Sequence, residues 1–118
     1  MRALEKEIYQ LVTFNIDPSF LKSLPDCIIT NWIEGCYDVV PTTTNKWAGI
    51  LQMVKHFGIN PQEVATIGDG MNDIEMLQGS NFSIAMGNAS DEVKKHAKFV
   101  TTHVKKNGIY NGIKHLLG

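Results

Sequence analysis

The chain has 118 residues, of which 43% are hydrophobic, and its formal net charge is −1. This length suits one modest domain or parts of two, and the apolar content excludes a disordered tail. The near-neutral charge gives no basic field for nucleic acid or anionic lipid, and no apolar run could span a bilayer, so we expect neither partner. Cys27 and Cys36 lack metal-ligand spacing, which indicates idle thiols in a reducing compartment and therefore a cytoplasmic protein.

The first forty residues have the pattern of a small α+β unit. Residues 8–16 are rich in β-branched and aromatic side chains and predict a strand, which Asp17-Pro18 ends. Residues 18–24 predict a short helix. Two further strands are predicted at 27–32 and 36–40, joined by a turn at 33–35.

From Pro41 onward the pattern changes to alternating strands and helices. The polar run 42–45 offers N-cap side chains, and the next helix carries an apolar face until Gly58 ends it. The predicted strands are 64–67, 82–86 and 98–101, with helices at 71–78, after Ser90 and after Asn107-Gly108. Alternation of this kind predicts an α/β fold, here part of a Rossmann-like parallel sheet with helices.

The residues from Gly68 to Asp73, Gly-Asp-Gly-Met-Asn-Asp, join a predicted strand to a predicted helix. Asp69 ends the strand, while Asn72 and Asp73 fall in the turn or the first helical turn, so two carboxylates and an amide can converge. Such oxygen ligands suit Mg²⁺, which often accompanies phosphate at the carboxyl end of an α/β strand. The alternative is that the two aspartates only cap the helix and complement its dipole.

Two other loop motifs do not fit this segment. A dinucleotide fingerprint needs a third glycine where Asp73 stands, and an EF-hand needs an oxygen ligand where Met71 stands. The segment resembles the fourth motif of the haloacid dehalogenase-like (HAD) phosphatases, and residues 83–89 resemble the stretch that comes after this motif in the Cof-type members with a large α/β cap. The resemblance implies that Asp69 and Asp73 hold or support Mg²⁺ and that Asn72 contacts the transferred phosphate.

Lys46 stands in the first turn of the predicted helix, where its charge opposes the helix dipole at a cost of up to about 1 kcal/mol. It is either a hydrated surface lysine or a residue kept there for function. It resembles the third-motif lysine of the same phosphatases, which implies that it neutralises the phosphate. That family usually has glycine after this lysine, whereas this chain has Trp47.

The first motif of the resembled family is absent. It supplies a nucleophilic aspartate in an Asp-x-Asp pair, and no two aspartates of this chain have that spacing. The resemblance therefore implies the C-terminal portion of a phosphatase, with residues 1–40 as the end of a cap domain and 41–118 as the second half of the core.

The sequence supports two hypotheses about function. The first is half of an enzyme site for Mg²⁺-dependent hydrolysis of small phosphorylated metabolites of the sugar phosphate type, inactive in this chain alone. The second is a non-catalytic folded remnant or structural module. With either, we expect a homo-oligomer or pairing with an N-terminal half, because removal of a neighbouring strand would expose a sheet edge.

Overall fold

The computed structural model describes residues 8–118, which form two compact units divided between Thr44 and Asn45. The predicted boundary follows residue 40. The first unit extends further because Thr42 N donates to Asp26 O and Thr44 N donates to Pro41 O. The assignment of the two units to a cap and a core domain stays a prediction.

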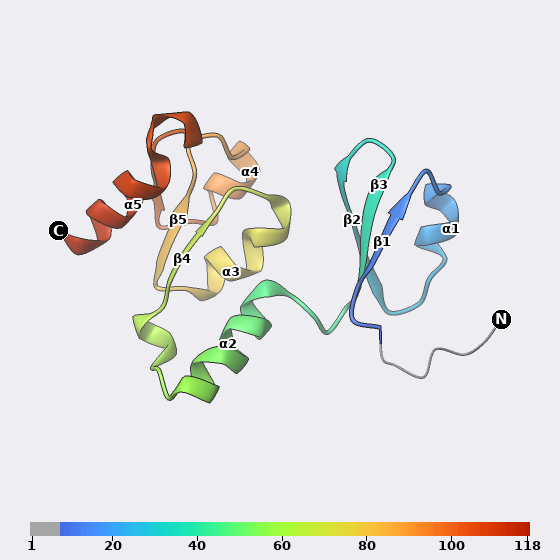
Figure 1. The fold of residues 1–118 in the computed structure, drawn as a ribbon, viewed down its shortest axis with the longest axis horizontal. Coiled ribbons are helices and arrows are strands. Elements are labelled where there is room, and N and C mark those ends of the chain that lie inside the picture. Colours follow the sequence, from blue (N-terminus) through green and yellow to red (C-terminus); the bar gives the residue numbers. More distant parts are fainter. Residues whose placement is uncertain (1–7) are drawn as a thin grey trace. The chain divides into compact units, whose positions relative to one another are not determined.

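The N-terminal unit is a three-stranded antiparallel sheet with one short helix (Figure 1). Its elements are β1 (Leu11–Phe14), α1 (Pro18–Lys22), β2 (Cys27–Ile33) and β3 (Cys36–Pro41). The strand order is β1-β3-β2, and β1 is shorter than the predicted strand 8–16. It ends at Phe14 because that residue pairs with Cys36, where β3 begins, and the next residue, Asn15, has a left-handed φ of 54°.

The C-terminal unit is a three-stranded parallel sheet with helices, which confirms the predicted α/β class (Figure 1). Its helices are α2 (Lys46–Phe57), α3 (Ile74–Gly79), α4 (Asp91–Lys94) and α5 (Gly108–Leu117). Its strands are β4 (Ala65–Gly68), β5 (Phe82–Ala85) and β6 (Phe99–Val100), in the order β4-β5-β6. Three 3-10 turns complete it: η1 (Pro61–Glu63), η2 (Met71–Asp73) and η3 (Val104–Lys106).

Local capping explains where the helices of this unit begin and end. The Asn45 side chain accepts a hydrogen bond from Ala48 N at the start of α2, and Gly58 ends α2 with a left-handed φ of 67°. Ser90 caps α4 by accepting from Val93 N. The side chains of Asn45 and Ser90 satisfy backbone N–H groups at the start of α2 and α4, and the Gly58 N–H donates to carbonyls in the last turn of α2.

The core of the C-terminal unit lies between the sheet and its helices. Leu77 of α3 is fully buried and forms a cluster with Ala89 and Val93. On β5, Ile84 is also fully buried, and Gly112 of α5 packs directly on it. Among residues 8–118, no helix is long and apolar enough to cross a membrane.

Candidate active site

Asp73 closes the loop that follows β4. Its side chain is 7% exposed, and its Oδ2 accepts hydrogen bonds from Asp69 N and Gly70 N, both at 2.9 Å. Glycine at position 68 allows the Asp73 side chain to approach the backbone this closely, because a Cβ on residue 68 would lie 2.6 Å from the Cβ of Asp73. Asp73 N also donates to Gly70 O, an i to i+3 bond, so the predicted helix 71–78 begins as the 3-10 turn η2.

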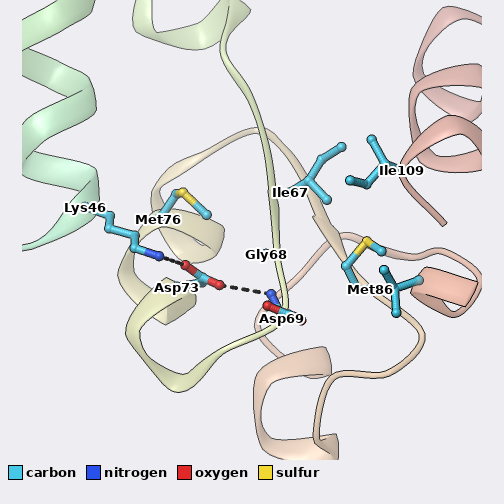
Figure 2. A pocket seen from close by; sticks show the side chains of 9 residues that line it. Lys46, Ile67, Gly68, Asp69, Asp73, Met76, Met86 and Ile109 are labelled. Carbon is cyan, nitrogen blue, oxygen red and sulfur yellow. Dashed lines mark hydrogen bonds and ion pairs between the residues drawn. The ribbon is translucent and has the colours of Figure 1, made fainter. Parts of the chain in front are cut away.

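Lys46 projects from the first position of α2 and forms an ion pair with Asp73 Oδ1 (Figure 2). The Lys46 side chain is 49% exposed, so its charge is shared between Asp73 and solvent. A lysine at a helix N-terminus is locally unfavourable, and the carboxylate of Asp73 offsets that cost. The contact with Asp73 therefore gives a physical reason for a lysine at a position where its charge opposes the helix dipole.

The environment of Asp73 keeps its carboxyl charged. Burial raises the pKa of Asp73, but hydrogen bonds from the Lys46 ammonium and from the amides of Gly70 and Asp69 lower it by more. The pKa of Asp73 consequently lies below its ordinary value. At neutral pH the loop contains a permanent negative charge that is already bound by protein donors.

Asp69, by contrast, is exposed and presents its carboxylate beside the loop. Its Oδ2 accepts a hydrogen bond from Asn88 Nδ2 at 2.9 Å, and within the described residues its Oδ1 accepts none. Asn88 in turn accepts from Val104 N at 3.0 Å. Asn88 was not predicted from the sequence; its place just after β5, next to β4 in a parallel sheet, is the signal that could have identified it.

Three of the predicted site residues line one cleft. This cleft has a volume of about 380 Å³ and combines a charged corner with apolar walls (Figure 2). Its lining residues are Lys46, Ile67, Gly68, Asp69, Asp73, Met76, Met86, Val104 and Ile109. Asn72 is exposed and does not line it; its amide oxygen lies near Gly70, where a Cβ would be only 2.6 Å from that oxygen.

A family model described as haloacid dehalogenase-like hydrolase matches residues 3–113. The chain belongs to this family. The uncharacterized protein in the pdhA 5′ region of Geobacillus stearothermophilus is 45% identical over 85 residues, which make up 72% of this chain and 90% of that protein. This relative is similar in sequence across most of its own length.

Two longer phosphatases match nearly all of this chain. The 5-amino-6-(5-phospho-D-ribitylamino)uracil phosphatase YwtE of Bacillus subtilis is 29% identical over 119 residues, covering 95% of this chain and 42% of that protein. A solved structure of the HAD subclass IIB sugar phosphatase BT4131 superposes with a TM-score of 0.83 at 36% identity, covering 94% of this chain and 44% of that one. The chain therefore spans less than half the length of either phosphatase.

The donor set at this haloacid dehalogenase-like site suits a hard cation. Oxygen atoms such as those of carboxylates are the ligands that Mg²⁺ takes, and Asp69, which lines the cleft, has an Oδ1 that accepts no hydrogen bond within the described residues. Both oxygens of Asp73 already accept hydrogen bonds from protein donors. Each oxygen still has lone-pair capacity, but Asp73 has no oxygen that is free of protein contacts. Across residues 8–118, no group of three His, Cys, Asp or Glu side chains could enclose a metal ion.

Proposed function

We propose that this chain supplies the lysine and metal-binding part of a Mg²⁺-dependent phosphatase. The observation that carries the proposal is the linked set of Lys46, Asp73 and the Asp69 amide beside the exposed Asp69 carboxylate. A lysine bound to a buried carboxylate is held in place before substrate arrives. Preorganised charges of this kind stabilise the charge that develops in a transition state.

Each proposed site residue has a distinct part. Lys46 neutralises a phosphate in the cleft. Its side chain is half exposed, and an ammonium has three donors, so donors remain for that purpose beyond the contact with Asp73. Asn72, exposed on η2, contacts a phosphate oxygen through its amide. Asp73 acts on the site by fixing Lys46 and the backbone from Asp69 to Gly70.

Asp69 and Asp73 form the proposed metal site. Asp69 offers Oδ1 directly, and Asp73 contributes its nearby negative charge while remaining bound to protein donors. When bound, Mg²⁺ would supply Lewis-acid polarisation of a phosphoryl oxygen. One directly offered carboxylate leaves most of the six octahedral positions to water or to other groups, so we expect weak binding by this chain.

The proposed substrates are small phosphorylated metabolites of the sugar phosphate type. The matched structure is that of a sugar phosphatase, and the matched Bacillus subtilis protein is named for a phosphorylated ribityl compound. The two free cysteines, Cys27 and Cys36, accord with a reducing compartment, and we place the protein in the cytoplasm.

This chain contains no Asp-x-Asp pair to accept the phosphoryl group, so we expect no hydrolysis by it alone. An aryl phosphate assay with Mg²⁺ should show no turnover, while calorimetric titration should detect Mg²⁺ binding in the millimolar range that Asp69→Asn abolishes. Metal-dependent turnover lost in Asp69→Asn would contradict the inactivity. Micromolar Mg²⁺ affinity would show a more complete site, and unchanged binding in Asp69→Asn would contradict the metal role of Asp69.

A further inference from the structure

Asn88 connects the Asp69 carboxylate to a different wall of the cleft. We infer that Asn88 is a positioning residue: it fixes the orientation of the Asp69 carboxylate for a divalent cation and couples that carboxylate to η3. The inference rests on the proposed metal role of Asp69. It concerns a side chain that the motif around Asp69 does not contain.

The two hydrogen bonds of Asn88 determine which way its amide faces. Val104 N can only donate, so the Asn88 atom at 3.0 Å from it must be the oxygen. The nitrogen then faces Asp69 Oδ2 at 2.9 Å, where a carboxylate can only accept. Both contacts require a side chain with one donor and one acceptor, which an amide provides and a carboxylate does not.

The backbone around Asn88 is held close to the segment that leads into η3. Gly87 N donates to Thr102 O at 3.1 Å, and a Cβ on Gly87 would lie 2.6 Å from His103 N. A side chain at Gly87 would therefore push the two segments apart. Glycine at this position keeps Asn88 within reach of both Asp69 and Val104.

The turn η3 is itself tied to α5. Thr102 Oγ1 donates to Lys106 O at 2.8 Å, and Asn111 Nδ2 donates to both Thr102 Oγ1 and Lys106 O. Val104 of η3 and Ile109 of α5 both line the cleft. Figure 2 shows Asp69 and Ile109 along this same cleft. The hydrogen bonds from Asp69 to Asn88 and from Asn88 to Val104 therefore connect the charged corner of the cleft to its apolar wall.

This arrangement assigns different tasks to the two oxygens of Asp69. Asn88 holds Oδ2, and the rotamer fixed in this way leaves Oδ1 for a cation. Without Asn88 the exposed Asp69 side chain would lose the one hydrogen bond that it makes within residues 8–118, and it would sample other rotamers. Partners that orient a metal-binding side chain typically change metal affinity about 10–100-fold when removed.

The test uses the full 118-residue chain, with Mg²⁺ titrations followed by calorimetry and by backbone amide NMR shifts. In the wild type, the Val104 amide should shift with the same midpoint as the Asp69 amide. In Asn88→Ala, Mg²⁺ affinity should fall about tenfold or more and the Val104 amide should stop responding. Asn88 is exposed, so thermal unfolding should show that this variant remains folded.

Two further variants distinguish a positioning role of Asn88 from a general destabilisation of η3. Val104→Pro removes the N–H that Asn88 accepts, at a first helical position that tolerates proline, and should weaken Mg²⁺ binding by less than Asn88→Ala. Thr102→Val removes both hydrogen bonds of Thr102 Oγ1, to Lys106 O of η3 and from Asn111 Nδ2 of α5, without touching Asn88. This variant should lower stability while changing Mg²⁺ affinity by less than about twofold.

The outcomes distinguish this inference from the proposed function. Wild-type Mg²⁺ affinity in Asn88→Ala, together with loss of binding in Asp69→Asn, would overturn the inference alone. An equal loss of affinity in Thr102→Val and Asn88→Ala would overturn it as well, because a merely structural role predicts that result. If Asp69→Asn binds Mg²⁺ as the wild type does, the proposed function is wrong and the inference falls with it.

Discussion

Asp73 connects three parts of the site through two oxygen atoms. One oxygen pairs with the Lys46 ammonium, and the other accepts from two consecutive amides of the loop. The same carboxylate therefore stabilises the loop and holds a charged group from another helix. Removing it would leave two loop amides and one ammonium without their acceptor, so a stability defect and a binding defect should appear together.

This role of Asp73 predicts a specific dependence of stability on pH. The folded-state pKa of Asp73 lies below its unfolded value, so its contribution is fully present above about pH 4 and is lost as pH falls through the folded pKa. At pH 7, Asp73→Asn should lower the free energy of unfolding by about 1–3 kcal/mol. Urea unfolding of both proteins should show this difference shrinking below about pH 4.

A matched control for this prediction is Asp91→Asn. Asp91 is an exposed carboxylate in the first turn of α4, and its replacement should change stability by less than about 0.5 kcal/mol. A difference between wild type and Asp73→Asn that stayed constant from neutral pH to strongly acidic pH would contradict the proposed origin of the effect.

The site residues differ in how far the sequence could identify them. Asp69 and Asp73 stand four positions apart in one short motif, and Lys46 is conspicuous because it opposes a helix dipole. Asn88 shows neither of these signals, and its place after a strand is a weaker one, because asparagine is common in turns for local reasons. Its contact with Asp69 depends on the parallel pairing of β4 with β5, which brings residues 19 positions apart together.

At the scale of elements, the packing of α2 on α3 explains how the chain accommodates a tryptophan directly after Lys46. The family motif usually has glycine there, and this chain has Trp47. The Trp47 ring lies directly over Gly79 at the end of α3, in the space that a Cβ of residue 79 would occupy. The bulky side chain on one helix is thus accommodated by the missing side chain on the other.

This complementarity predicts opposite effects for two glycine substitutions. Gly79→Ala places a methyl group against the Trp47 ring and should lower the free energy of unfolding by about 1–3 kcal/mol. Gly49→Ala, on α2, meets nothing within 4 Å and should raise stability by up to about 1 kcal/mol, because alanine favours the helix. Thermal unfolding of both variants measures the two effects.

A double variant tests the cause of the first effect. Trp47→Leu combined with Gly79→Ala should recover part of the stability that Gly79→Ala loses, because the smaller side chain leaves room for the methyl group. Strictly additive losses in the double variant would show that the ring contact is not responsible.

Most elements were predictable because capping and periodicity act locally. The end of α2 at Gly58 and the start of α4 at Ser90 depend on residues only a few positions away. The end of β1 depends instead on where its partner β3 begins, and the 3-10 form of η2 depends on the loop bonds of Asp73. Neither of these tertiary constraints is present in a single stretch of sequence.

At the scale of the whole molecule, β4 and β6 are the two edge strands of the parallel sheet among the described residues, and β4 is the longer of the two. Its Gly68 O accepts from Met86 N next to β5, and backbone groups alternate in direction along a strand. The N–H and C=O groups of Ala65 and Ile67 therefore point away from β5. A strand edge with unpaired backbone groups tends to recruit another strand.

We therefore predict that this chain associates in solution through the β4 edge. Light scattering at high concentration should give a mass greater than that of one chain. Ala65→Lys places a charge on this edge and should shift the mass toward the monomer, since charged residues block pairing of edge strands. Gly49→Lys adds the same charge on the open surface of α2 and should leave association unchanged. A wild-type protein that remains a monomer at every concentration would contradict pairing through β4, and equal effects of the two lysine variants would attribute the change to net charge alone.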